Sequence, residues 1–220
     1  MTKTTFEFQT DIDMAEFISK RAHDLRSPYN HVVGFTKIVL NGQSGPLTDL
    51  QKEDLSISYK SAMRTLWVMN NLIDMARLSR KKRSLNLSDV DANQMLDEVI
   101  DHWKKYHYGD NSTIARMVLV NPPLIKADES LVRQVISNFI TYVKEYLQPN
   151  PNVTISVEDD QEGWLFTVEA TGDIKDLHSE LDLEMAGYVC QKYLELAGGK
   201  IRMGEAGDGK ATVKFVLPVE

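Results

Sequence analysis

The segment from residue 48 to residue 76 reads TDLQKEDLSISYKSAMRTLWVMNNLIDMA, and apolar side chains recur along it at alternating steps of four and three residues. The recurring positions are Leu55, Tyr59, Ala62, Leu66, Met69, Ile73 and Ala76. Such a repeat, sustained over three heptads, is typical of a helix that buries one stripe against other helices. The segment therefore predicts a long helix that begins near Thr48 and packs in a bundle.

A second periodic segment precedes this one, from Asp11 to Leu40, and Asp11 or Asp13 is suited to cap its start. Its helically spaced apolar residues are Met14, Ile18, Leu25, Tyr29, Val32 and Val39. Between the two segments, residues 41–46 concentrate helix breakers. A hairpin of two such helices exposes too much apolar surface to stand alone, so we expect a homodimeric four-helix bundle. The alternative is two helices of a larger monomeric domain.

After a short basic run at residues 80–83, the pattern changes to short apolar stretches that alternate with helical segments. We expect helices at 93–106, 129–146 and 183–196, and strands at 85–90, 117–120, 153–157, 165–168, 200–203 and 212–217. One mixed sheet covered by helices on one face is the simplest arrangement. The sequence thus predicts an α+β chain with two domains, residues 1–83 and residues 84–220.

The composition limits the classes of partner and compartment. A chain of 220 residues with 42% hydrophobic content can bury one or two ordinary cores. A net charge of -7 argues against a nucleic-acid partner, because neutralising phosphates requires clustered Lys and Arg. The chain has one cysteine, Cys190, and no run approaching the roughly 20 apolar residues of a membrane span. Because residues 1–10 also lack a leader pattern, we expect a cytoplasmic protein that does not contact a membrane.

The run His23-Asp24-Leu25-Arg26-Ser27-Pro28 combines residues that suit phosphoryl chemistry. Neutral imidazole is nucleophilic at one ring nitrogen, and the group that binds the other nitrogen selects which. Asp24 can hold the ring N–H and assist proton removal, and Ser27 lies one helical turn beyond His23, where a hydroxyl can orient water or a phosphoryl oxygen. A solvated polar surface is the alternative. Pro28 weakens it, because proline inside a helix costs about 3 kcal/mol and calls for a compensating purpose.

Residues 23–35, HDLRSPYNHVVGF, resemble the H-box of two-component sensor histidine kinases, and the similarity extends over nearly the whole chain. The resemblance implies that His23 is the phosphoacceptor, that Asp24 is the general base, and that Ser27 stands where the family's Thr or Asn assists phosphatase action. It also implies a dimeric bundle that docks response-regulator receiver domains. Our candidates for the receiver contact, with ordinary bundle packing as the alternative, are Tyr29, Val32, Val33 and Lys37.

The resemblance further implies that residues 84–220 correspond to the family's ATP-binding domain, but the nucleotide motifs are degenerate. In the family's N-box, Asn138 matches the first Asn, whereas Tyr142 stands in place of the Asn that binds Mg²⁺. Glu145 stands where the family often has Lys, and its charge would repel phosphate. We therefore expect that this chain has lost ATP binding.

The glycine boxes lead to the same expectation. In the segment that resembles the first glycine box, Ala170 stands where the family's Asp accepts the adenine amino hydrogen, and Gly172 is kept but the second glycine is absent. Only the 14 residues from Asp173 to Ala186 separate the two boxes, too few for a mobile lid over ATP. We expect no nucleotide and no metal ion in this chain, with Asn138 and Gly172 as relics. Any Mg²⁺ would come from the partner receiver.

Three functions remain. The first is a phosphotransfer protein, in which His23 takes a phosphoryl group from the aspartyl phosphate of one receiver and passes it to another. The second is a pseudokinase that binds or sequesters a response regulator or a kinase without chemistry. The third is a divergent but active sensor histidine kinase. Because pure binding needs no His-Asp pair and an autokinase needs a nucleotide site, the sequence favours the first.

Overall fold

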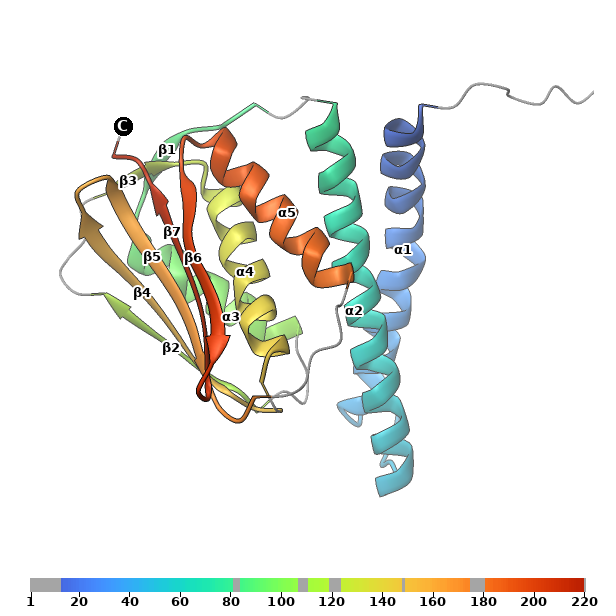
Figure 1. The fold of residues 1–220 in the computed structure, drawn as a ribbon. Helices are drawn as coiled ribbons and strands as arrows, with labels where there is room; N and C mark the ends of the chain where they lie inside the picture. Colours follow the sequence, from blue (N-terminus) through green and yellow to red (C-terminus); the bar gives the residue numbers. More distant parts are fainter. Residues whose placement is uncertain are drawn as a thin grey trace, which may run out of the picture.

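The chain begins with an antiparallel hairpin of two long helices, α1 (Met14–Leu40) and α2 (Asp49–Ser79), shown in Figure 1. The computed structural model describes residues 13–80, 84–106, 111–118, 124–147, 149–174 and 181–219. Asp13 caps α1, and Thr48 opens α2 with a capping box, in which its hydroxyl and a side chain one turn later each bond a backbone N–H. The predicted hairpin is confirmed, and of the two proposed caps Asp13 is the one observed. Asp11 lies outside the described residues.

Six of the seven heptad positions of α2 are buried, as the sequence predicts, from Tyr59 at 1% exposed to Leu66 at 9%, and the seventh, Leu55, is partly buried. The buried face of α1 is different from the one that the spacing suggests. It consists of Ala22, Val33 and Leu40, whereas the periodic residues Leu25 and Val32 are each 51% exposed. The helix carries two apolar stripes, and the stripe with the small residue Ala22 is the one that lies against α2.

The remainder of the chain forms one α/β unit. Its elements are β1 (Ser88–Val90), α3 (Ala92–Tyr106), β2 (Thr113–Val118), β3 (Ile125–Ala127), α4 (Glu129–Glu145), β4 (Asn152–Asp160), β5 (Gly163–Thr171), α5 (Leu181–Leu196), β6 (Lys200–Gly207) and β7 (Lys210–Leu217). The main sheet has the order β2-β4-β5-β7-β6. In it β2 pairs parallel with β4, and the other neighbours are antiparallel. The predicted mixed sheet is confirmed.

Two differences from the expected strands have simple causes. The strand expected at 85–90 is the short β1, which pairs with β3 in a separate two-stranded sheet and not with the main sheet. The sequence analysis missed β3, because three residues are too few to show an alternation. The strand expected at 117–120 corresponds to β2, which begins four residues earlier, at Thr113. Residues 119 and 120 of the expected strand lie outside the described part of the chain.

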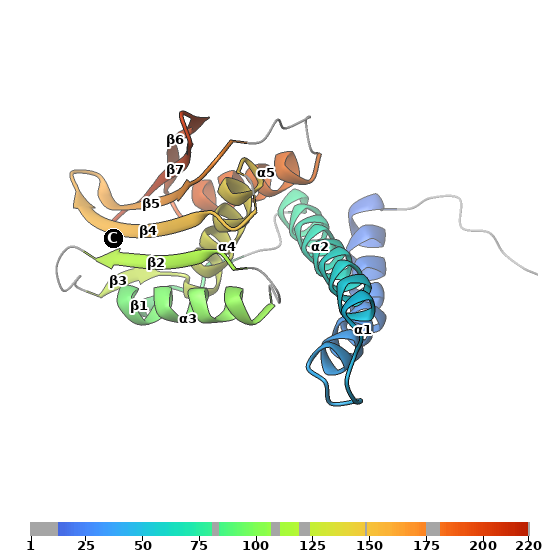
Figure 2. The same ribbon diagram turned by 90° about the horizontal axis from the view of Figure 1, so that it is seen from below.

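The large core lies between the main sheet and its covering helices. Phe166 of β5 is fully buried and stacks on Phe215 of β7, with ring centroids 4.8 Å apart. Phe139 of α4 packs against the same ring of Phe215, at 5.5 Å. Helices α4 and α5 lie between the sheet and the hairpin, and α2 stands between them and α1 (Figures 1 and 2). None of the helices that the structure describes is long and apolar enough to cross a membrane.

Candidate functional site

His23 lies in the first half of α1 and its side chain is exposed to solvent. The helix continues without a break through Pro28, five residues later. Because proline has no N–H, the carbonyl of Asp24 loses its usual partner within the helix. His23, the predicted nucleophile, therefore lies on a solvent-accessible face of α1, beside a helical turn that lacks one backbone hydrogen bond.

The Asp24 carboxylate pairs with Arg21 in the structure. Adjacent residues of an α-helix point about 100° apart, and Asp24 is directed toward Arg21, whose Nη1 lies 3.4 Å from its carboxylate. Ser27 is exposed and follows His23 by one turn, on the same side of the helix. The geometry thus brings Ser27 to the side of His23, and leaves Asp24 in a surface ion pair.

The four candidates for receiver contact occupy different environments. Val33 is buried against α2, and Tyr29 is partly buried against the same hairpin core. Lys37 is half-buried, while Val32 is exposed. Ordinary bundle packing accounts for Tyr29 and Val33, so Val32 and Lys37 are the two candidates whose side chains are open to a partner.

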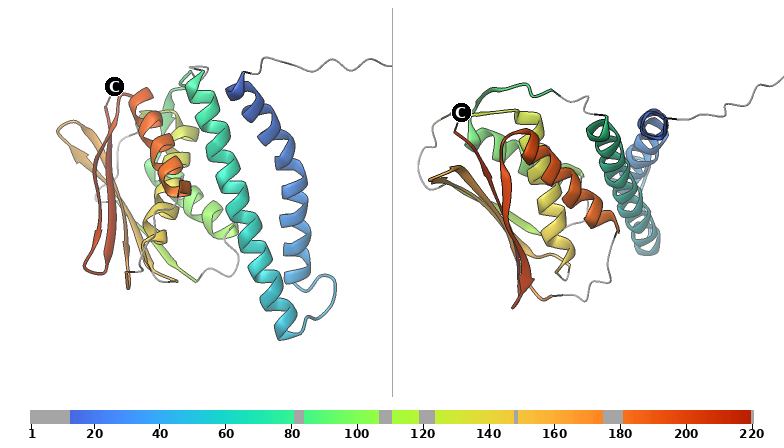
Figure 3. Two further views of the ribbon diagram at one scale, coloured as in Figure 1. Left: turned by 45° about the vertical axis from the view of Figure 1, so that its right-hand side comes forward. Right: turned by 45° about the horizontal axis from the view of Figure 1, so that its top comes forward.

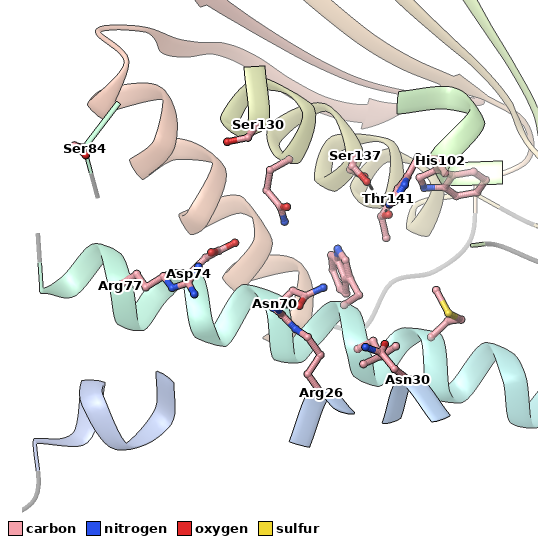
Figure 4. Close-up of a pocket in the computed structure, with 15 residues that line it drawn as sticks. Arg26, Asn30, Asn70, Asp74, Arg77, Ser84, His102, Ser130, Ser137 and Thr141 are labelled. Atoms are coloured by element: carbon pink, nitrogen blue, oxygen red, sulfur yellow. Dashed lines mark hydrogen bonds between the residues drawn. The ribbon is translucent and has the colours of Figure 1, made fainter. Parts of the chain in front are cut away.

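A cleft of about 870 Å³ lies between the hairpin and the α/β unit (Figure 4). Helix α1 contributes Arg26 and Asn30, and the Arg26 guanidinium donates a hydrogen bond of 2.6 Å to the Asn70 side-chain oxygen on α2. The opposite wall is a polar row of α4 that includes Ser137 and Thr141. His23 precedes Asn30 by seven residues, which is about two turns, so both lie on the same face of α1.

The position that the resemblance assigns to the Mg²⁺ ligand is filled by an aromatic pair. The Tyr142 and Tyr146 hydroxyls are 3.1 Å apart, and their ring centroids are 5.3 Å apart. Burial, together with the hydrogen bond to Tyr146, raises the pKa of Tyr142 to about 12. Across from it, a Cβ at Gly187 of α5 would lie 3.8 Å from the Tyr142 ring. The side chain at this position is therefore a bulky phenol that is neutral at physiological pH.

The other motif positions are also placed by the structure. Ala170 is fully buried within β5, and Gly172 follows that strand as an exposed residue. Residues 175–180, within the segment that the sequence analysis expects to be too short for a lid over ATP, lie outside the described residues. Among the residues that the structure does describe, no group of three or more His, Cys, Asp or Glu side chains is arranged to hold a metal ion.

Asn138, which matches the first Asn of the N-box, takes part in the contact between α4 and α2. It is 1% exposed and lies on the face of α4 that meets α2, where its side chain bonds Asn71 and Trp67. Sequence reasoning missed both partners, which belong to no motif. The only signal was a pair of adjacent asparagines, Asn70 and Asn71, between the apolar heptad positions Met69 and Ile73.

Comparisons with known proteins agree with this architecture. The circadian input-output histidine kinase CikA of Synechococcus elongatus is 23% identical over 159 residues, which are 71% of this chain and 21% of CikA. Hybrid signal transduction histidine kinase G of Dictyostelium discoideum is 31% identical over 131 residues, 58% of this chain and 4% of its own length. The chain thus spans about a fifth or less of these curated relatives. No model of a protein family matches it.

Solved structures show the same fold. Full-length ShkA in complex with AMPPNP superposes with a TM-score of 0.64 at 21% identity, over 94% of this chain and 46% of ShkA. The histidine kinase ThkA in complex with the response regulator protein TrrA superposes with a TM-score of 0.59 at 16% identity, over 96% of this chain and 68% of that one. The chain therefore has the fold of a two-component histidine kinase, a helical hairpin followed by a mixed sheet covered by helices.

Proposed function

We propose that this chain is a phosphotransfer protein of a two-component system. His23 takes a phosphoryl group from the aspartyl phosphate of one receiver domain and passes it to a second receiver, without ATP. The observation that carries the proposal is a contrast: His23 is exposed on a continuous helix, whereas position 142 is filled by a partly buried tyrosine that is hydrogen-bonded to Tyr146. The likeness to ThkA, whose structure was solved with a response regulator, supports a receiver as the partner.

The transfer step needs little from this chain beyond its nucleophile. One ring nitrogen of His23 attacks the phosphorus, the acyl P–O bond breaks, and the receiver's carboxylate leaves. The acyl phosphate already supplies the transfer potential, and Mg²⁺ bound by the receiver would neutralise the phosphoryl oxygens. Asp24 can turn from Arg21 to the other ring nitrogen of His23 at small cost, because an exposed ion pair contributes only about 0–1 kcal/mol.

The mechanism suggests separate roles for the two domains of the chain. We propose that residues 1–83 form the dimerisation and phosphotransfer domain, and that residues 84–220 form a scaffold domain derived from an ATP-binding fold. A neutral phenol at Tyr142 is a poor ligand for Mg²⁺, which prefers carboxylate and phosphate oxygens. The scaffold thus carries no phosphoryl donor, and the protein would act in the cytoplasm, where receivers are found.

Calorimetric titration of Mg-ATP into the purified full-length chain is the test that needs no knowledge of the partner. We expect no binding heat up to millimolar nucleotide, because Tyr142 occupies the position of a metal ligand and Glu145 adds a repulsive charge. A titration with Mg²⁺ alone provides the control for heats of dilution and weak metal binding. Micromolar affinity for Mg-ATP would overturn the proposal in favour of an active autokinase.

We also propose that the hairpin pairs with a second copy of itself. Its α1 helix exposes an apolar stripe that the monomer leaves uncovered, made of Met14, Phe17, Leu25, Val32, Phe35 and Ile38. Exposed patches of this kind mark association surfaces. A dimer that covers the stripe also covers Val32, which leaves Lys37, on nearly the same face as His23, as the better candidate for receiver contact.

The variant Phe35→Glu is expected to convert the dimer to a monomer in sedimentation velocity at micromolar concentration. Phe35 is 67% exposed in the single chain, so a charge there leaves the monomer fold intact but is buried on dimerisation. The control Phe35→Leu keeps an apolar side chain and should remain dimeric. If Phe35→Glu sediments as the wild-type chain does, α1 does not form the dimer interface through this stripe.

The second candidate function is a binding module without chemistry. It is favoured by Asn138, an N-box residue whose side chain bonds α2 of the hairpin. It differs from phosphotransfer in one respect, because it does not use the His23 side chain. The substitution that separates the two functions is argued in the Discussion.

A further inference from the structure

A closed cluster of hydrogen bonds joins the hairpin to the α/β unit. The Trp67 indole N–H donates to the Asn138 side-chain oxygen at 3.0 Å, and the Asn138 amide donates to the Asn71 side-chain oxygen at 3.0 Å. The Asn71 amide in turn donates to the carbonyl of Trp67 at 3.2 Å. Both asparagines are buried, with Asn71 at 0% and Asn138 at 1% exposed.

Such a cluster fixes a geometry that apolar packing alone does not. Leu and Met side chains tolerate sliding between helices, whereas a buried amide is satisfied only where its partner stands within hydrogen-bond reach. A shift of α4 along α2 would leave the side chains of Asn71 and Asn138 buried without partners, at about 1–3 kcal/mol for each group. Buried polar groups with one satisfied arrangement therefore select one register between the packed elements.

Asn138 also contacts a residue deeper in the α/β unit. Its amide also faces the thiol of Cys190 on α5, which is buried among the residues of the large core. Asn138 thus links α2, α4 and α5 at one point. The side chain that the N-box resemblance would assign to a nucleotide site has its oxygen and its amide engaged in hydrogen bonds between the two units.

We propose that Trp67, Asn71 and Asn138 form a latch that holds the α/β unit in one orientation on the hairpin. Trp67 and the neighbour of Asn138, Ser137, both line the cleft, so the latch also keeps the cleft beside the face of His23 open to a fixed width. The latch concerns how the two units are joined, and it holds whether or not His23 transfers a phosphoryl group.

The test measures the distance between the two units in the full-length chain. Spin labels are attached at Asp54→Cys on α2 and Asp159→Cys on β4, both of which are exposed, whereas native Cys190 is buried and does not react in the folded protein. Pulsed electron resonance should give one narrow distance in the parent. Asn138→Ala should replace it with a broad distribution, with the helical circular dichroism retained.

A matched control and a milder variant make the result decisive. Asn70→Ala removes the adjacent asparagine, which accepts a hydrogen bond from Arg26 of α1 and bonds no described residue of the α/β unit, and should keep the narrow distance. Trp67→Phe removes the indole donor but keeps an aromatic ring, and should broaden the distribution even if Asn138→Ala fails to fold. A narrow, unshifted distance in Trp67→Phe, and in any folded Asn138→Ala, would overturn the latch and leave ordinary packing as the account of the contact.

Discussion

The variant His23→Ala is expected to lose all acceptance of a phosphoryl group while it keeps the wild-type fold and receiver binding. In the proposed mechanism the loss is complete, because the substitution removes the group that takes up the phosphoryl group. Stability should change by no more than about 0.5 kcal/mol, because His23 is exposed and contributes nothing to either core. The effect is thus confined to chemistry.

The matched control is His31→Ala. His31 is also exposed on α1, but it is eight residues from His23 and is therefore rotated by about 80° around the helix. Receiver domains charged with labelled acetyl phosphate are mixed with each chain, and the label on the chain is measured. Wild-type protein and His31→Ala should be labelled, and His23→Ala should not. Label that persists on His23→Ala, or a cellular function that survives the substitution, would favour a binding module over phosphotransfer.

Much of the fold could be predicted because its signals are local. Heptad spacing in α2, the breakers between the two helices, and the alternation in β4 and β5 each depend on residues close together in the chain. The short strand β3 escaped prediction because its partner, β1, is far away in sequence. In a three-residue strand, the pairing with β1 decides the conformation more than the residues of the strand themselves do.

The site was less predictable than the fold, because its decisive contacts join distant segments. His23, Asp24 and Ser27 could be selected from one short run, but the pairing of Asp24 with Arg21 depends on which way each side chain turns. The role of Asn138 depends on Asn71, which is 67 residues away in the chain. Neither the conformational choice nor the long-range contact leaves a periodic signal in the sequence.

The substitution Phe166→Ala has the largest expected effect on stability. Phe166 is fully buried in the large core and stacks in parallel on Phe215 at 4.8 Å. Removing a buried phenyl ring costs about 3–5 kcal/mol, a large part of the roughly 5–15 kcal/mol that stabilises a typical domain. Urea unfolding followed by circular dichroism should therefore show a much lower midpoint, while Phe166→Leu, which keeps an apolar side chain, should lower it far less. An unchanged midpoint in Phe166→Ala would mean that this core is not formed as described.

This variant also tests how the two parts of the chain share the function. Phe215 contacts Phe139, the residue next to Asn138, so loss of the core would also loosen the latch on the hairpin. The hairpin has a separate core around Tyr59 and Leu66. If Phe166→Ala unfolds the α/β unit first, and the chain still accepts a phosphoryl group on His23, then residues 1–83 carry the chemistry alone. If acceptance falls with the α/β unit, the fixed orientation of that unit is itself part of the transfer site.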